Sequence, residues 1–312
     1  MKALGLPLFH VPWVAFPIGI PPVYSSSGRK GKVGAPSAVW PAALARPLGG
    51  KGSTGVGESV NLADWIERKR EVLQRLRPVD VRNLVPTVRD FSQAVSTRRE
   101  ELAVVAEIAR ATPEEGRLVE ALDIGEMVRQ ADSASAAAVA IGTDEIGFAA
   151  TPSDLPTAAR AASCPVVARD LILVREQLYH LRLQGADAVL LMASAIAPTE
   201  LRSWMEILAS MHMAAPVEVA SESELSSSLA CGARLLVIPA FSSRSLSLAV
   251  ADRLLPLVPR STTVLVRGPF ARPEDFEPLR GRADGVWIAA PLLASDDPQS
   301  FLANLVRAAE NG

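Results

Sequence analysis

Short apolar runs alternate with helix-period stretches along most of this chain. Eight runs are rich in Val, Ile and Leu and lack polar alternation, which is typical of parallel strands buried on both faces. They occupy residues 102–109, 137–143, 164–172, 188–194, 215–220, 234–240, 262–268 and 285–291. Stretches with helical periodicity lie between them, for example 197–212, 221–232 and 271–281. Eight such units in about 210 residues predict an α/β fold, a (β/α)8 TIM barrel whose ring is closed by a last helix over 297–310.

A further amphipathic stretch precedes the first strand. Asn61 is suited to cap a helix at its start, and Pro78 ends the pattern. The positions at helical spacing are Leu62, Trp65, Ile66, Lys69, Val72, Leu73 and Leu76. We therefore expect an N-terminal helical extension of the barrel over 61–77.

The first 57 residues differ in charge from the rest of the chain. Six of the 32 basic residues and none of the 34 acidic residues lie there, so residues 58–312 carry a net charge of −8. A basic, acid-free leader rich in Ser, Ala, Gly and Pro is typical of an organellar transit peptide, and a disordered tail is the alternative. Its uncharged stretch 3–23 contains five prolines, which break a membrane-spanning helix. We therefore predict a targeting-like leader over 1–57, no transmembrane segment, and a barrel over 58–312.

Composition argues against several classes of function. A net charge of −2 provides no electrostatic basis for binding nucleic acid or an anionic membrane. Two cysteines, Cys164 and Cys231, and three scattered histidines match neither a disulfide framework nor a zinc site. We expect no metal and no cofactor, and we interpret both cysteines as buried thiols at the strand-entry end of the barrel.

Candidate site residues lie where the predicted strands end, because TIM-barrel active sites form at the C-terminal ends of the strands. Two carboxylates and three arginines occupy these positions: Glu107, Glu218, Arg110, Arg169 and Arg267. The glutamates are either an acid/base pair or remnants that each pair with a nearby arginine. The arginines either form an anion site or belong to ordinary ion-paired surface. Thr143 and Asp144 are expected to cap the segment after the second strand.

Several stretches of the body resemble the indole-3-glycerol phosphate synthase family. In the family's order they include "AEIARATPEEG" (106–116), "TDEIGF" (143–148), "CPVVARDLI" (164–172), "PVEVASESEL" (216–225) and "CGARLLVI" (231–238). The resemblance covers roughly residues 61–310 and implies a TIM barrel. It also implies a reaction that closes an indole ring on a carboxyphenylamino deoxyribulose phosphate, with loss of carbon dioxide and water.

The catalytic positions depart from that family. The motif implied for the first loop is Glu-Ile-Lys-Arg-x-Ser-Pro-Ser-x-Gly; its glutamate is kept as Glu107, whereas its lysine falls on Ala109. The implied general-acid lysine falls on Arg169, which holds its proton too tightly to donate it. The strand-five glutamate is kept as Glu218. Later strand ends also differ, at Pro239, Ala240, Phe241, Arg267, Gly268, Pro269, Ala289, Ala290 and Pro291. The prolines at 269 and 291 remove N–H groups from the loops that grip phosphate in such barrels.

Three hypotheses follow from this mixture of kept and lost positions. The first is a catalytically degenerate barrel that acts as a structural or interaction protein with other proteins of an organellar complex, in a plastid rather than a mitochondrion. The second is an active, divergent synthase of tryptophan biosynthesis, a carbon-carbon lyase. The third is a barrel that holds another small anionic ligand through Arg169 and Arg267.

Overall fold

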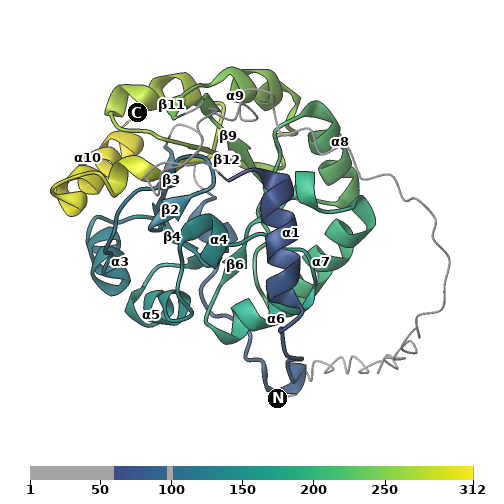
Figure 1. Ribbon diagram of the computed structural model, residues 1–312. Helices are drawn as coiled ribbons and strands as arrows, with labels where there is room; N and C mark the ends of the chain where they lie inside the picture. Colours follow the sequence, from purple (N-terminus) through teal and green to yellow (C-terminus); the bar gives the residue numbers. More distant parts are fainter. Residues whose placement is uncertain (1–59, 97–100, 243, 312) are drawn as a thin grey trace, which may run out of the picture. The chain divides into compact units, whose positions relative to one another are not determined.

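The computed structural model describes residues 60–96, 101–242 and 244–311 (Figure 1). All eight apolar runs form parallel strands, as predicted. The strands are β1 (Ala103–Ile108), β4 (Ala138–Gly142), β5 (Val166–Arg169), β6 (Ala188–Val189), β7 (Leu191–Met192), β8 (Val217–Glu218), β9 (Leu235–Pro239), β12 (Thr263–Gly268) and β13 (Gly285–Ile288). Their hydrogen-bonded order is β6-β5-β4-β1-β13-β12-β9-β8-β7. Since only Leu190 separates β6 from β7, both ends of this order belong to one run of chain, and the strands form a ring of eight.

Helices surround this ring (Figure 1). They are α3 (Ile124–Ser133), α5 (Asp154–Ala161), α6 (Glu176–Leu183), α7 (Pro198–Ser210), α8 (Glu222–Cys231), α9 (Ala249–Leu254) and α10 (Pro298–Glu310). Asp123, Ser221 and Asp297 begin α3, α8 and α10, and each side chain accepts a hydrogen bond from a free backbone N–H of the first turn. The predicted closing helix is therefore confirmed as α10.

The stretch 271–281 is not the α-helix that its periodicity predicted. It forms the 3-10 helix η4 (Pro273–Leu279). Pro278 lies inside this element and has no N–H for an i to i−4 bond, so an α-helix cannot continue through it. Phe276 and Leu279 are nevertheless fully buried, so the apolar positions were correctly placed although the type of helix was wrong.

Side chains alternate between the two faces of each strand. On β1, Ala103 and Val105 pack inside the barrel with residues such as Val167, Leu265 and Trp287, whereas Val104 and Ala106 belong to the core between strands and helices. Parallel strands covered on both sides need apolar residues on both faces, which explains the continuous apolar runs in the sequence. At the entry end of the barrel, Phe91 and Val95 join the interior cluster. Phe91 begins the short helix α2 (Phe91–Ala94).

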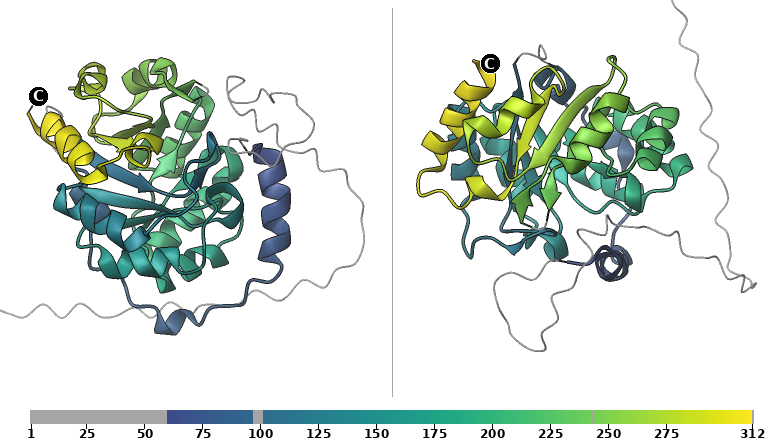
Figure 2. Two further views of the ribbon diagram at one scale, coloured as in Figure 1. Left: turned by 60° about the vertical axis from the view of Figure 1, so that its left-hand side comes forward. Right: turned by 90° about the horizontal axis from the view of Figure 1, so that it is seen from above.

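The predicted N-terminal helix is present as α1 (Leu62–Leu73), and Asn61 caps it by accepting a hydrogen bond from the Ala63 N–H. It ends four residues earlier than the predicted stretch 61–77. Figure 2 shows α1 lying against one end of the strands, apart from the helices of the ring. Among the described residues, no helix is both long and apolar enough to cross a membrane. The leader predicted over 1–57 lies outside the described residues.

Candidate active site

Four alternate strands contribute one charged layer to the interior of the barrel. Its members are Glu107 at the end of β1, Arg169 of β5, Glu218 of β8 and Arg267 of β12. Interior layers of TIM barrels are built from alternate strands in this way. Glutamate and arginine alternate in chain order. Charges of opposite sign can therefore pair across the mouth of the barrel, which is its opening at the C-terminal ends of the strands. The sequence prediction that these four residues converge agrees with the ion pairs described next.

Each glutamate of the layer has an arginine partner. Arg169 Nη1 donates a hydrogen bond to Glu107 Oε1, and Trp287 Nε1 donates to Glu107 Oε2 over 2.8 Å. Arg267 Nε donates to Glu218 Oε2 over 3.0 Å. The Glu107 and Arg267 side chains are only 1% exposed. Burial of this degree makes the pairing necessary, because an unpaired buried charge is strongly destabilising. Trp287 was given no functional role from the sequence, yet it supplies one of these donors.

Glu114 connects the two ion pairs and was missed by the sequence analysis. It lies in the turn of a small hairpin formed by β2 (Ala111–Thr112) and β3 (Gly116–Arg117), directly after β1. Its Oε1 accepts hydrogen bonds from Arg169 Nη2 over 2.9 Å and from Arg267 Nη2 over 2.6 Å. In the family motif quoted above, this position is the second serine. A glutamate in the loop after the first strand, opposite two strand-end arginines, was the signal that could have revealed it.

The two glutamates of this turn have opposite pKa shifts. Burial by itself would raise the pKa of Glu114, but Arg169 and Arg267 outweigh it and hold that pKa at about 2. Burial raises the pKa of Glu115 to about 7, helped by the negative charges of Glu114 and Glu107. The fixed anion at 114 is therefore followed by a carboxyl that titrates near neutral pH.

Arg110 does not belong to this network. Its guanidinium forms an ion pair with Asp154, at the start of α5, and donates to the backbone oxygen of Leu122 over 3.3 Å. Arg110 lies two residues beyond the end of β1, where the chain bends and the side chain is directed to α5 rather than to the mouth. Of the three arginines predicted from the sequence to bind an anion, Arg169 and Arg267 thus meet at the mouth, and Arg110 lies outside this group.

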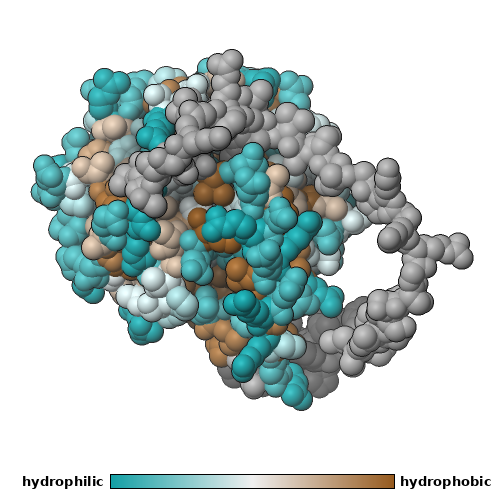
Figure 3. All heavy atoms as spheres, in the orientation of Figure 1, coloured by the Kyte–Doolittle hydropathy of each residue, from teal (hydrophilic) through white to brown (hydrophobic). Residues whose placement is uncertain are grey.

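An apolar cluster and α1 cover the position of the lost lysine. Ala109 is buried with Leu62 and Trp65 of α1, Phe148 and Leu171. Trp65 and Phe148 meet edge to face with their ring centroids 5.7 Å apart, and Phe148 also lies under the Arg169 guanidinium at 4.7 Å. Figure 3 shows that the outward face of α1 is largely hydrophilic and that hydrophobic residues are visible beside it. The space that a lysine would need at 109 is therefore part of a packed core.

A second buried ionic cluster joins α1 to the rim of the barrel. Lys69 Nζ donates to Asp144 Oδ2 over 2.5 Å and to Asp170 Oδ1 over 2.6 Å. Asp144 also accepts hydrogen bonds from the Trp65 indole over 2.7 Å and from two backbone N–H groups at the start of α4 (Glu145–Phe148). The capping role predicted for Asp144 is confirmed, whereas Thr143 donates to Asp170 over 3.2 Å. Burial by itself would lower the pKa of Lys69, but Asp170 and Asp144 outweigh it and raise that pKa, so Lys69 is a fixed cation. A lysine within the apolar stripe of 61–77 was the sequence signal for this cluster.

The replaced residues after the sixth, seventh and eighth strands also form ordered structure. Phe241 begins a hairpin of β10 (Phe241–Ser242) and β11 (Ser245–Leu246), and its ring lies 4.7 Å from the Arg267 guanidinium carbon. The Ala240 N–H donates to the Arg267 backbone oxygen over 2.7 Å, and the Ala289 N–H donates to that of Gly268 over 3.1 Å. Pro291 lies within the 3-10 helix η5 (Ala290–Leu292). At these positions the structure thus shows ring packing by Phe241 and backbone hydrogen bonds.

No metal site emerges among the residues that the structure describes, where no three His, Cys, Asp or Glu side chains group suitably. Cys231 is buried as predicted, whereas Cys164 is only partly buried, and neither forms a disulfide. Burial and the neighbouring Asp132 raise the pKa of the Cys164 thiol, so it is protonated at neutral pH and unsuited to nucleophilic attack.

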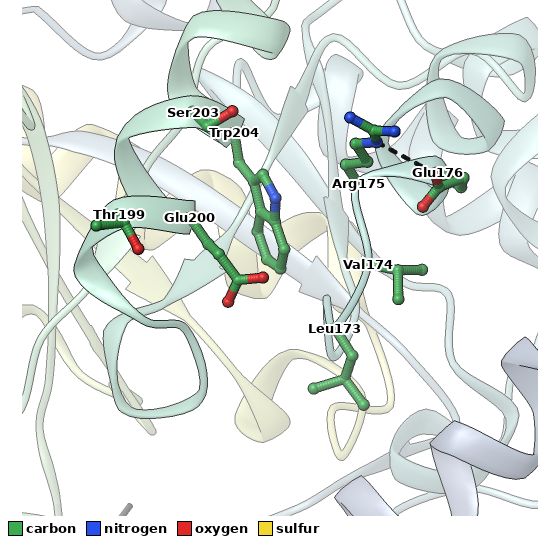
Figure 4. A pocket seen from close by; sticks show the side chains of 8 residues that line it. All are labelled: Leu173, Val174, Arg175, Glu176, Thr199, Glu200, Ser203 and Trp204. Atoms are coloured by element: carbon green, nitrogen blue, oxygen red, sulfur yellow. Dashed lines mark hydrogen bonds and ion pairs between the residues drawn. The ribbon is translucent and has the colours of Figure 1, made fainter. Parts of the chain in front are cut away.

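A pocket of about 470 Å³ lies away from the charged layer (Figure 4). Leu173, Val174, Arg175 and Glu176 line one side, and Thr199, Glu200, Ser203 and Trp204 of α7 line the other. Arg175 Nε donates to the adjacent Glu176 over 3.2 Å, so its charge is largely neutralised within the pocket wall. The pocket is lined by none of the five residues that form the mouth network, namely Glu107, Glu114, Arg169, Glu218 and Arg267.

The fold and the charged layer define a TIM-barrel protein whose candidate active site lies at the C-terminal ends of its strands. A family model described as indole-3-glycerol phosphate synthase matches residues 61–305. The chain belongs to the indole-3-glycerol phosphate synthase family.

Proteins named indole-3-glycerol phosphate synthase are similar to the chain over most of its body. The one from Parafrankia sp. is 32% identical over 227 residues, which cover 72% of this chain and 84% of the relative. The one from Chloroherpeton thalassium is 28% identical over 243 residues, covering 74% and 94% respectively. Among solved structures, thiamine phosphate pyrophosphorylase from Pyrococcus furiosus superposes with a TM-score of 0.50 at 17% identity, over 68% of this chain and 96% of that one. This structural likeness supports the fold alone.

Proposed function

We propose that this protein is a catalytically degenerate member of its family that acts as a structural or interaction protein within an organellar complex. The observation that carries the proposal is the hydrogen bonding of Glu114 to both Arg169 and Arg267 inside the mouth. A substrate that needs this space and these cations must compete with a carboxylate already held there.

The chemistry of the mouth supports the same proposal. Arginine keeps its proton at a pKa above about 12, so Arg169 is a poor general acid where the family's lysine would donate. Losing a positioned general acid costs roughly 10²- to 10⁴-fold in rate. Ala109 is enclosed by apolar neighbours, so a second functional position has become part of the core.

Turnover of the family's substrate is the direct test. The purified protein, incubated with the carboxyphenylamino deoxyribulose phosphate, is expected to release no indole-glycerol phosphate above an enzyme-free blank. The Parafrankia relative, assayed in parallel, is the positive control. Conversion by this protein at an ordinary enzyme rate would refute the proposal.

Location and partnership need separate measurements. Residues 1–57 fused to a fluorescent reporter are expected to direct it to an organelle, with a plastid favoured over a mitochondrion. The native protein in an extract of that organelle is expected to migrate with a large assembly. Migration as a free monomer would argue against an interaction role even if no turnover were found.

The second candidate function is an active, divergent lyase of tryptophan biosynthesis. One observation favours it: Glu115 has a pKa of about 7 and follows Glu114 in the same turn, and acid/base catalysis uses groups that titrate near the working pH. Glu218 also keeps its position on the fifth strand. This candidate predicts that Glu218→Gln abolishes turnover, and it fails if neither substrate nor product shifts the melting temperature.

A further inference from the structure

The two arginines of the mouth are held in place independently of Glu114. Arg169 is paired with Glu107 and lies over the Phe148 ring, and Arg267 is paired with Glu218 and lies over the Phe241 ring. Each guanidinium therefore has an ionic and an aromatic anchor on the barrel itself. Glu114 comes from outside this frame, from the turn of a hairpin with two residues in each strand.

The contact between Glu114 and the arginines leaves hydrogen-bonding capacity unused. Both arginines direct their Nη2 donors to one oxygen, Oε1. Arg267 Nη1 and Glu114 Oε2 are buried and have no hydrogen-bond partner. Arginine forms its strongest contacts with carboxylates when two parallel N–H groups meet two oxygens. A carboxylate that is free of the hairpin can reach this two-oxygen geometry, which the tethered side chain does not.

The two arginines also favour an anion at this point, although the net charge of the mouth does not. Without Glu114, the layer contains two glutamates and two arginines and has no net charge. With it, the network carries one negative charge, and the two arginines keep the pKa of Glu114 at about 2 despite complete burial. The frame thus stabilises one additional carboxylate in its ionised form.

We propose that the mouth is a binding site for a small monocarboxylate, and that the Glu114 side chain occupies it as an internal ligand that competes with a free one. Arg169 and Arg267 define the site. The turn Thr112–Gly116 must move away from these arginines before a free ligand can bind to them. Ala111 and Thr112 of β2 are buried, so the movement concerns the tip of the hairpin, where the Glu115 N–H bonds to Thr112 Oγ1 over 3.1 Å and the Val60 N–H bonds to the Pro113 oxygen over 2.9 Å. This inference does not depend on the absence of lyase activity.

The test removes the internal ligand and supplies an external one. Glu114→Ala is expected to melt at a lower temperature than the unaltered protein, and sodium formate is expected to restore stability in a saturable way. The melting temperature of Glu114→Ala should rise by roughly 3 to 5 °C at a formate concentration ten times the Kd. The unaltered protein should need on the order of ten times more formate for the same rise, because its tethered carboxylate competes.

Four matched controls separate site binding from general salt effects. Sodium chloride at equal ionic strength should not reproduce the rise. Glu115→Ala, in the same turn, should respond to formate no more than the unaltered protein does. Glu114→Gln keeps the side-chain volume but loses the competing charge, so its response should lie between those of the unaltered protein and Glu114→Ala. Arg267→Lys combined with Glu114→Ala should lose most of the response, because lysine lacks the paired donors.

Two results would overturn the proposal: equal shifts with formate and chloride in Glu114→Ala, or equal formate sensitivity in Glu114→Ala and the unaltered protein. If Glu114→Ala does not fold, Glu114→Ser provides the same comparison with a smaller cavity. Turnover of the lyase substrate by the unaltered protein would defeat the proposed function and leave this inference intact. If formate does not change the melting temperature of Glu114→Ala, this inference fails and the proposed function is unaffected.

Discussion

Two buried ionic clusters lie at the same end of the barrel, and they differ in how completely their polar atoms are satisfied. The rim cluster joins Lys69 to Asp144 and Asp170, with further donors from Trp65, Thr143 and two backbone N–H groups. The mouth network contains Glu107, Glu114, Glu218, Arg169 and Arg267. Four buried side-chain atoms in the described residues lack a hydrogen-bond partner; two belong to the mouth network and none to the rim cluster.

This difference separates a structural anchor from the candidate active site. The rim cluster fixes a helix that comes from outside the barrel, and nothing in it remains unpaired among the atoms described. The mouth network lies where TIM-barrel chemistry takes place and keeps one donor and one acceptor without partners. Buried polar atoms without partners are uncommon in folded proteins, so the two in the mouth network are consistent with the ligand site proposed above.

The largest expected effect comes from removing the cation of the rim cluster. Lys69→Met leaves two buried carboxylates without their shared partner, which should lower the free energy of unfolding by roughly 3 to 5 kcal/mol. Urea denaturation followed by circular dichroism measures this loss. Arg70→Met, at the exposed neighbouring position of α1, is the matched control and should change stability by about 0.5 kcal/mol or less. Equal losses in the two variants would show that Lys69 is not an anchor.

A matched pair of tryptophans compares hydrogen bonds in the two clusters. Trp287→Phe removes the indole N–H donor to Glu107 Oε2 and should cost about 2 to 3 kcal/mol. Trp65→Phe removes the donor to Asp144 Oδ1, which keeps two backbone donors, so about 1 kcal/mol is expected. Both indoles are buried, so the packing losses are similar and the difference reports the hydrogen bonds. A larger loss at Trp65 would reverse the proposed contrast.

The turn at the mouth should impose a pH dependence through Glu115. Its folded pKa, about 7, lies above its ordinary value of 4.5, so the folded state binds the proton more tightly than the unfolded state does. Its contribution to stability is fully present below about pH 4.5 and is lost as the pH rises to about 7. Glu115→Gln should therefore be more stable than the unaltered protein at pH 8, by on the order of 1 kcal/mol after allowance for solvent screening, and the gap should close by pH 5. Thermal melts across this range provide the measurement, and a pH-independent gap would contradict the shift.

The smallest expected effect is the coupling between the clusters. Among the described hydrogen bonds, none joins a side chain of one cluster to a side chain of the other, although Thr143 Oγ1 also donates to the Arg169 backbone oxygen over 3.4 Å. The losses in Trp65→Phe and Trp287→Phe should therefore add to within about 0.5 kcal/mol in the double variant. Urea denaturation of the four proteins of this cycle gives the coupling energy. A coupling above about 1 kcal/mol would mean that the anchor and the mouth act as one network, linked through the adjacent residues Arg169 and Asp170.

The sequence alone determined most of the fold. Strand and helix periodicity is a local property, so the eight strands, the leading helix with its Asn61 cap and the closing helix α10 could all be read from it. The prediction of an α-helix over 271–281 was wrong, because Pro278 interrupts the helical hydrogen bonds although the apolar spacing is helical. The strand pattern was also sufficient to place Glu107, Arg169, Glu218 and Arg267 at strand ends. These ends meet at one mouth of a TIM barrel, so the four residues were expected to lie together.

Only the tertiary structure decided which of these side chains meet. Arg267 and Glu114 are 153 positions apart in the chain, and Trp287 and Glu107 are 180 apart. Such pairs depend on the register between strands, because a shift of one residue moves a side chain to the opposite face of the sheet. The sequence placed the chemistry at one end of the barrel. Strand register and the hairpin turn determined that a glutamate, rather than open space, lies between the two arginines.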